Sequence, residues 1–157
     1  MTDKGVNVPF RSSDMALRRP SMIASWESVG RIDGNVVIVE DDPTLLRITQ
    51  YIVEELGAKT VTFETADQAL EYLVQSSLHC CIVIADYGVP GQINGMDLVR
   101  IVREKWPSVK TLLMSGYPLL PETVPYPTVY LPKPWTVDQL LFSISRLLRP
   151  GTPGQKL

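Results

Sequence analysis

The stretch that decides the fold is His79–Pro90, with the sequence HCCIVIADYGVP. The residues from Cys80 to Ala85 are apolar and rich in β-branched side chains, which is typical of a strand covered on both faces of a parallel sheet. The run stops at Asp86, and Gly88 and Pro90 then predict a loop. A carboxylate is therefore expected at the carboxyl end of a central strand. Open α/β sheets bind ligands at that edge, although a lone Asp there can also simply begin a turn.

Apolar runs and helical periodicities alternate along the rest of the chain. Further strands are predicted over residues 36–39, 59–63, 109–114 and 128–131. Helices are predicted from Pro43 to the stop at Gly57, after a capping box at Thr65, over residues 95–105, and from Thr136 onward. This alternation predicts an α/β fold, a doubly wound parallel sheet with helices on both faces. Right-handed crossovers favour the flavodoxin-like strand order 2-1-3-4-5.

Composition limits the class of protein. The 157 residues suffice for one domain with tails, and we expect a flexible leader over 1–35, a folded domain over 36–149 and a loose tail over 150–157. A weak pattern over residues 21–29 offers a short helix carrying Trp26 as the alternative within the leader. A net charge of -2 argues against a nucleic-acid-binding surface, and no apolar run approaches the ~20 residues of a membrane span. The adjacent Cys80 and Cys81 are interpreted as reduced core residues. These features predict a cytoplasmic protein.

Polar groups follow the other predicted strands as well. Glu40 and Asp41 come after the first strand, Ser115 after the fourth and Lys133 after the fifth. In the order 2-1-3-4-5 the first and third strands are neighbours, so both acids should converge with Asp86 at one mouth, beside Ser115 and Lys133. Each group alone has a plainer interpretation: a solvated helix cap for the acids, an ordinary turn for Ser115 and a surface lysine for Lys133.

Clustered carboxylates repel one another, and a hard divalent cation such as Mg²⁺ offsets that repulsion. Lys133 supplies a second positive charge and Ser115 a hydroxyl donor. The Asp86 carboxylate would then be a nucleophile for a phosphoryl group, with cations ready to neutralise the transferring oxygens.

Four segments carry a family resemblance: VVIVEDDP from residue 36, CIVIADYGVPGQINGMDL from 81, TLLMSGY from 111 and VYLPKPW from 129. Together they resemble a CheY-like response-regulator receiver domain, in register from about residue 36 to 149. The resemblance implies that Asp86 is the phospho-acceptor. It also implies that Asp41 and Asp86 bind Mg²⁺ directly, that the backbone carbonyl of Gly88 completes the protein ligands, and that Glu40 acts through water.

By the same resemblance, Lys133 pairs with the phosphoryl group, Ser115 is the switch hydroxyl, and Tyr130 occupies the position of the switch aromatic. The expected function is that of a single-domain response regulator. It would accept a phosphoryl group from a sensor histidine kinase or a histidine phosphotransfer protein. It would then signal to an unknown downstream protein or act as a phosphate sink, with no nucleic-acid or membrane partner. On this view it is a signalling protein with autodephosphorylation rather than an enzyme.

Two departures from the family pattern concern loops. The segment PGQING, which begins at Pro90, has one residue more than the common form, so the loop beside the site is expected to bulge. Residues 117–127 contain four prolines where the family has its fourth helix, and four prolines preclude an ordinary helix. The fourth helix is therefore predicted to be rudimentary or missing, and the usual output face to differ.

Two rival functions are compatible with parts of the same pattern. One is a phosphorylation-independent interaction module that retains only the fold; Mg²⁺ binding would count against it. The other is a metal-dependent hydrolase or phosphatase, which commonly needs a second acid two residues after its nucleophile, where this chain has Gly88. A nucleotide-binding sheet is disfavoured because no Gly-rich turn follows the first strand.

Overall fold

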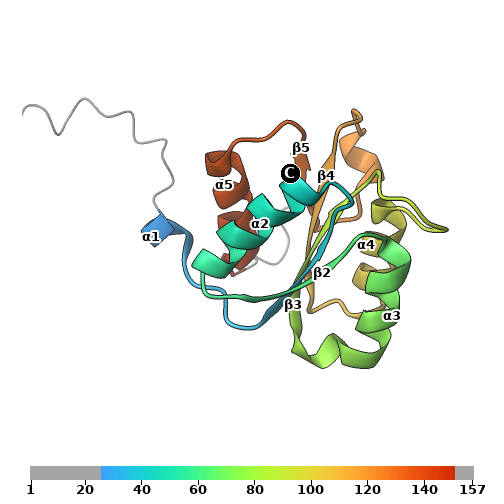
Figure 1. Cartoon of the computed structure of the whole chain (residues 1–157), viewed down its shortest axis with the longest axis horizontal. Helices are drawn as coiled ribbons and strands as arrows, with labels where there is room; N and C mark the ends of the chain where they lie inside the picture. Colours follow the sequence, from blue (N-terminus) through green and yellow to red (C-terminus); the bar gives the residue numbers. More distant parts are fainter. Residues whose placement is uncertain (1–25, 151–157) are drawn as a thin grey trace, which may run out of the picture.

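The computed structural model describes residues 26–150 and contains a five-stranded parallel sheet in the order β2-β1-β3-β4-β5. The strands are β1 Asn35–Val39, β2 Lys59–Phe63, β3 Cys80–Asp86, β4 Lys110–Ser115 and β5 Val129–Pro132 (Figure 1). The predicted fold class and strand order are thereby confirmed. All neighbouring strands run parallel, so their carboxyl ends lie at one edge of the sheet.

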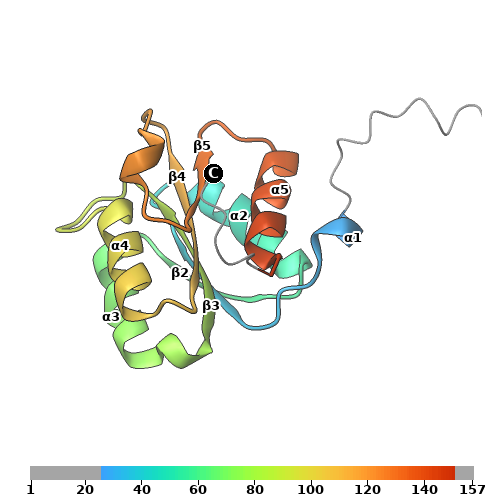
Figure 2. The ribbon, with the colours of Figure 1, turned by 180° about the vertical axis from the view of Figure 1, so that it is seen from behind.

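Helices cover both faces of the sheet (Figures 1 and 2). The core on one face is built with α2 (Pro43–Glu55) and α5 (Val137–Leu148), and the core on the other with α3 (Ala66–Ser76) and α4 (Gly95–Lys105). Each of these helices begins after a side chain that accepts a backbone N–H group, as the sequence pattern predicts for the first two of them. The capping residues are Asp42, Thr65, Asn94 and Thr136. No helix within residues 26–150 is long and apolar enough to cross a bilayer.

The central strands divide their side chains between the two cores. Val36 and Ile38 of β1 point to the α2/α5 side, whereas Val37 and Val39 point to the α3/α4 side, and all four are fully buried. This burial on both faces explains why β1 and β3 appear in the sequence as continuous apolar runs. It also holds the strand ends rigidly, which matters for the groups that follow them.

The folded part of the chain begins before the expected boundary at residue 36. A short helix, α1 (Trp26–Val29), packs against α5, and Val29 and Ile32 are buried in the α2/α5 core. The amide of Ile32 donates a hydrogen bond to the carbonyl oxygen of Leu56 at 2.9 Å. Residues 26–35, assigned to a flexible leader from the sequence, therefore belong to the packed structure. The rest of that leader, residues 1–25, and the tail from 151 lie outside the described residues.

The segment between β4 and β5 contains no α-helix. Its only helical turn is the 3₁₀ turn η3 (Pro121–Thr123), as the prolines predict. Leu119 and Val124 pack against the α3/α4 core, so this irregular segment covers part of that core without forming a helix. Tyr117, Leu120 and Tyr126 remain largely exposed.

Candidate functional site

Three carboxylates converge at the carboxyl edge of the sheet. One oxygen from each of Glu40, Asp41 and Asp86 lies within 4.8 Å of the other two. The register explains this convergence: Val39 of β1 pairs with Ala85 of β3, so the acids that follow these positions are neighbours. Glu40 and Asp86 are buried, whereas Asp41 is exposed. The cluster therefore has a buried base and one open side.

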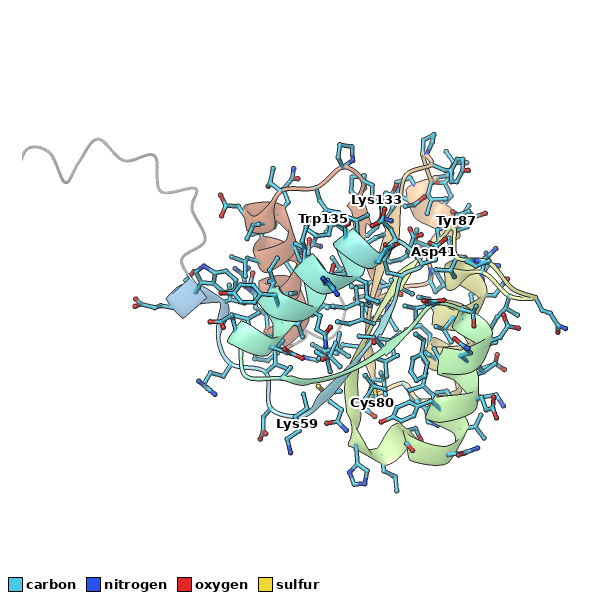
Figure 3. All side chains as sticks on the ribbon, in the orientation of Figure 1. Asp41, Lys59, Cys80, Tyr87, Lys133 and Trp135 are labelled. Carbon is cyan, nitrogen blue, oxygen red and sulfur yellow. The ribbon has the colours of Figure 1, made fainter. Side chains whose placement is uncertain are left out.

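Lys133 brings the opposing charge from the end of β5. Its Nζ atom lies 2.8 Å from Oε2 of Glu40 and 3.0 Å from Oδ1 of Asp86. The backbone amide of Lys133 donates to the carbonyl oxygen of Ser115 at 2.8 Å, which ties the start of this loop to β4. Figure 3 shows Lys133, Asp41 and Tyr87 at the same end of the molecule, opposite Lys59 and Cys80.

Burial and pairing act against each other in this cluster. Burial raises the pKa of the Glu40 carboxyl, although the hydrogen bond from Lys133 offsets part of that rise. Burial alone would lower the pKa of Lys133, but its hydrogen bonds to Glu40 and Asp86 and their negative charges outweigh it and raise the pKa. Lys133 therefore stays protonated and partly neutralises the carboxylates.

Ser115 and Tyr130 both interact with Tyr117. The buried Ser115 hydroxyl accepts the amide of Tyr117 and donates to its carbonyl oxygen, each at 2.9 Å. The Tyr130 hydroxyl donates to the same carbonyl oxygen at 3.3 Å. The Tyr117 ring packs edge-on against Tyr87, with centroids 6.3 Å apart. Ser115 thus lies at the predicted strand end, but its hydroxyl bonds the loop rather than a carboxylate.

Gly88 and Gly95 both follow Asp86, and the structure gives them different roles. A Cβ atom at Gly88 would lie 3.7 Å from Oδ2 of Asp86, an ordinary contact, so the glycine leaves the space beside that oxygen open. A Cβ atom at Gly95, the first residue of α4, would lie 2.1 Å from the backbone oxygen of Asp86. Gly95 is therefore what lets α4 approach the end of β3, a role that sequence analysis did not assign.

The longer loop after Asp86 is fastened by a side chain that sequence analysis also missed. The carboxylate of Asp67, in the first turn of α3, accepts the amide of Gln92 at 3.0 Å. Next to it, Gly91 has φ +119, a conformation that L side chains rarely adopt. The extra residue in PGQING was the available signal, but it did not reveal which side chain would hold the loop.

The donor set fits a hard divalent cation. Mg²⁺ prefers carboxylate oxygens and keeps several waters, and here three carboxylates meet with one of them exposed. A cavity of about 350 Å³ lies beside the cluster and is lined by Leu45, Gly116, Lys133, Pro134 and Trp135. Its wall therefore includes the same lysine that pairs with the acids.

Comparison with known proteins gives one consistent family. Residues 36–144 match the profile described as the response regulator receiver domain. The chain is 28% identical over 119 residues to the DNA-binding transcriptional regulator NtrC of Proteus hauseri, covering 73% of this chain and 24% of NtrC. It is 33% identical over 118 residues to the sensor protein TorS of Escherichia coli, covering 71% of this chain and 13% of TorS.

Solved structures agree with this match. A response regulator receiver protein from Sinorhizobium medicae superposes with a TM-score of 0.67 at 22% identity, covering 73% of this chain and 94% of that one. The response regulator PhyR from Brucella abortus gives a TM-score of 0.66 at 25% identity, covering 76% of this chain and 49% of the PhyR chain. The chain spans about a quarter or less of the length of the two curated relatives named above, and about half of PhyR.

Proposed function

The chain belongs to the response regulator receiver domain family, and from this premise we propose that Asp86 accepts a phosphoryl group from a phosphohistidine. The donor would be a sensor histidine kinase or a histidine phosphotransfer protein. One observation carries the proposal: Nζ of Lys133 lies 2.8 Å from Glu40 and 3.0 Å from Asp86 within a cluster of three carboxylates. A salt bridge that served stability alone would not need two further acids beside it.

The transfer is a displacement at phosphorus. A lone pair of an Asp86 carboxylate oxygen forms the new O–P bond, the P–N bond to the donor imidazole breaks, and its electron pair stays on the imidazole nitrogen. Lys133 would then pair with an oxygen of the transferred group, because its ammonium already lies 3.0 Å from Oδ1 of Asp86. The product is an acyl phosphate, which water can hydrolyse to regenerate the carboxylate.

Mg²⁺ is the expected cofactor. Asp41, Asp86 and the backbone carbonyl of Gly88 would hold it directly, and Glu40 through water. When bound, the ion would neutralise charge on the phosphoryl oxygens. The chain's own contribution is to keep the carboxylates close together on adjacent strand ends, so that little rearrangement is needed.

Ser115 and Tyr130 are proposed as the switch pair. The Ser115 hydroxyl can donate to only one acceptor, so a bond to the phosphoryl group replaces its bond to the carbonyl of Tyr117. The Tyr130 hydroxyl donates to the same carbonyl oxygen, so the position of the Tyr130 side chain should change when the Ser115 bond is lost. Phosphorylation would thereby shift the population of a surface conformation.

We further propose that the protein acts as a phosphoryl-accepting receiver in the cytoplasm, without an enzymatic activity of its own beyond autodephosphorylation. It would either bind a downstream protein or drain phosphoryl groups from a kinase. A long phosphoryl lifetime favours signalling, and a very short one favours the sink. The rival is a phosphorylation-independent interaction module, which predicts no Mg²⁺-dependent phosphorylation at all.

The test is incubation with acetyl phosphate, or with a kinase, in the presence of Mg²⁺. Intact-mass analysis should show one base-labile phosphoryl group on the wild type and none on Asp86→Asn. Asp138→Asn, at an exposed position in the first turn of α5, is the matched control and should be phosphorylated normally. Equal phosphorylation of Asp86→Asn, or none on the wild type, would overturn the assignment.

A further inference from the structure

A second cavity, of about 610 Å³, is lined by none of the three clustered carboxylates. It is bordered by the N-terminal half of α2, the end of β2 and the outer face of α3. Leu46, Phe63 and Tyr72 form its apolar wall, and the rings of Phe63 and Tyr72 are in contact with centroids 5.4 Å apart. Glu64 and Glu71 add two exposed carboxylates. The groove thus combines an apolar wall with negative charge.

The groove runs along an open sheet edge. β2 is the outermost strand at this end of the sheet and pairs only with β1. In Figure 1 it runs between α2 and α3 with no helix in front of it. An edge strand presents unpaired backbone N–H and C=O groups, to which an extended segment can be added as a further strand. The walls of the groove would then hold the alternate side chains of that segment.

Charge indicates the kind of segment that fits. Within residues 26–150, neither Glu64 nor Glu71 has an ion-pair partner, since both ion pairs there belong to Lys133. That part of the chain has fifteen acidic and ten basic side chains, whereas residues 1–25 have four basic and two acidic ones. A second copy of the groove would bring like charges together, so an occupant with basic side chains is favoured.

The sequence before the described residues contains a segment with these properties. In VNVPFR, residues 6–11, apolar Val6, Val8 and Phe10 alternate with the other residues, which is the pattern of a strand with one apolar face. Lys4 precedes this run and Arg11 follows it, so both ends of the segment carry positive charge. A proline inside the segment is compatible with an edge strand, because one side of such a strand needs no donor.

We propose that residues 6–11 bind in this groove of the same chain and extend the sheet at β2. The connection is long enough. Ile32 is bonded to Leu56, at the C-terminal end of α2, and Leu46 lies ten residues back along that helix, about 15 Å away. Trp26, where the linker ends, lies six residues before Ile32 and so adds at most about 20 Å, which makes about 35 Å in all. Residues 12–25 can span up to about 46 Å. The proposal does not depend on phosphorylation of Asp86.

Amide hydrogen exchange of the full-length protein tests this docking. The amides of residues 6–11 should exchange at least about tenfold more slowly than an unstructured chain, at a rate independent of protein concentration. Phe10→Ser should remove most of the protection. Arg11→Glu and Glu71→Lys should each weaken it by about threefold, and the double variant should restore it. Glu55→Lys, an exposed change on α2 outside the groove, is the matched control and should leave it unchanged.

Three results would overturn the proposal. Exchange of residues 6–11 at the rate of an unstructured chain would show that no docking occurs. Protection that increases with protein concentration would assign the contact to a second copy instead of the same chain. Protection that is insensitive to Glu71→Lys would place the segment elsewhere. None of these readouts involves the phosphoryl group, so they fail or succeed separately from the proposed function.

Discussion

Replacement of Lys133 by Met removes the one cation that the described structure places among the three carboxylates. At an effective dielectric constant of about 20, the contacts at 2.8 Å and 3.0 Å each correspond to an attraction of about 6 kcal/mol before desolvation. Without Lys133, Glu40 and Asp86 repel each other by at least about 3 kcal/mol at 4.8 Å. Loss of one partner from a buried pair typically costs about 3–5 kcal/mol.

The variant can reduce that cost by taking up a proton. Glu40 has an ordinary pKa of 4.5, which burial raises, so protonating it at pH 7 costs at most about 3 kcal/mol. In the variant, the folded state then binds more protons than the unfolded state, and its unfolding free energy rises relative to the wild type as the pH falls. We expect a loss of about 3 kcal/mol at pH 7 that shrinks to about 1 kcal/mol at pH 5.

Urea unfolding at both pH values, with and without Mg²⁺, measures these differences. Mg²⁺ should raise the unfolding midpoint of Lys133→Met more than that of the wild type, because the ion replaces the missing charge. Lys105→Met, at an exposed position in the last turn of α4, is the control and should change stability by no more than about 0.5 kcal/mol. A Lys133→Met midpoint equal to that of the wild type at pH 7, with no response to Mg²⁺, would refute the electrostatic argument.

Three further predictions concern the surrounding structure. Gly95→Ala should lower the free energy of unfolding, measured in urea, by about 1–3 kcal/mol, because the new Cβ would lie 2.1 Å from a backbone oxygen. In Gly116→Ala the new Cβ would have no atom within 4 Å, so the free energy of unfolding should change by less than about 1 kcal/mol. Asp67→Ala should cost about 1 kcal/mol and speed exchange of the Gln92 amide, with partial rescue by Asp67→Asn. Burial raises the pKa of the Cys80 thiol from 9.0 to about 11. At pH 8, alkylation of Cys80 should therefore be about a hundredfold slower in the folded protein than in the urea-unfolded protein. Similar alkylation rates in the two states would contradict the burial of Cys80.

The sheet could be predicted almost completely from the sequence. β1 and β3 are covered on both faces, so in the sequence they are continuous apolar runs. The connections between the strands then restrict the strand order. The convergence of Glu40 and Asp86 follows from that order, because the groups that come directly after neighbouring parallel strands share one edge. Lys133 follows β5, which β4 separates from β3, and its long side chain reaches both acids along the same edge.

The packing of residues 26–34 could not be predicted in this way. Val29 and Ile32 are isolated apolar residues with no helical or strand period, and their burial depends on surface offered by α2 and α5. The role of Gly95 is hidden for a similar reason: one sequence shows a glycine at a helix start but not how near that start comes to β3. Both features depend on distances between elements that are far apart in the sequence, and a local sequence pattern does not contain these distances.

The peptide of Tyr117 is where the candidate site meets the segment that replaces a helix. Its carbonyl oxygen accepts hydrogen bonds from both Ser115 and Tyr130, and the chain then continues into η3 and the exposed side chains of Leu120 and Tyr126. The backbone hydrogen bonds within that segment close short turns, such as the bond from the amide of Thr128 to the carbonyl of residue 125, so no helix stiffens it. On the proposed function, a phosphoryl group that draws the Ser115 hydroxyl away removes one of the two bonds on this carbonyl. The resulting change would therefore reach the surface through an irregular, proline-rich segment instead of through the movement of a rigid helix.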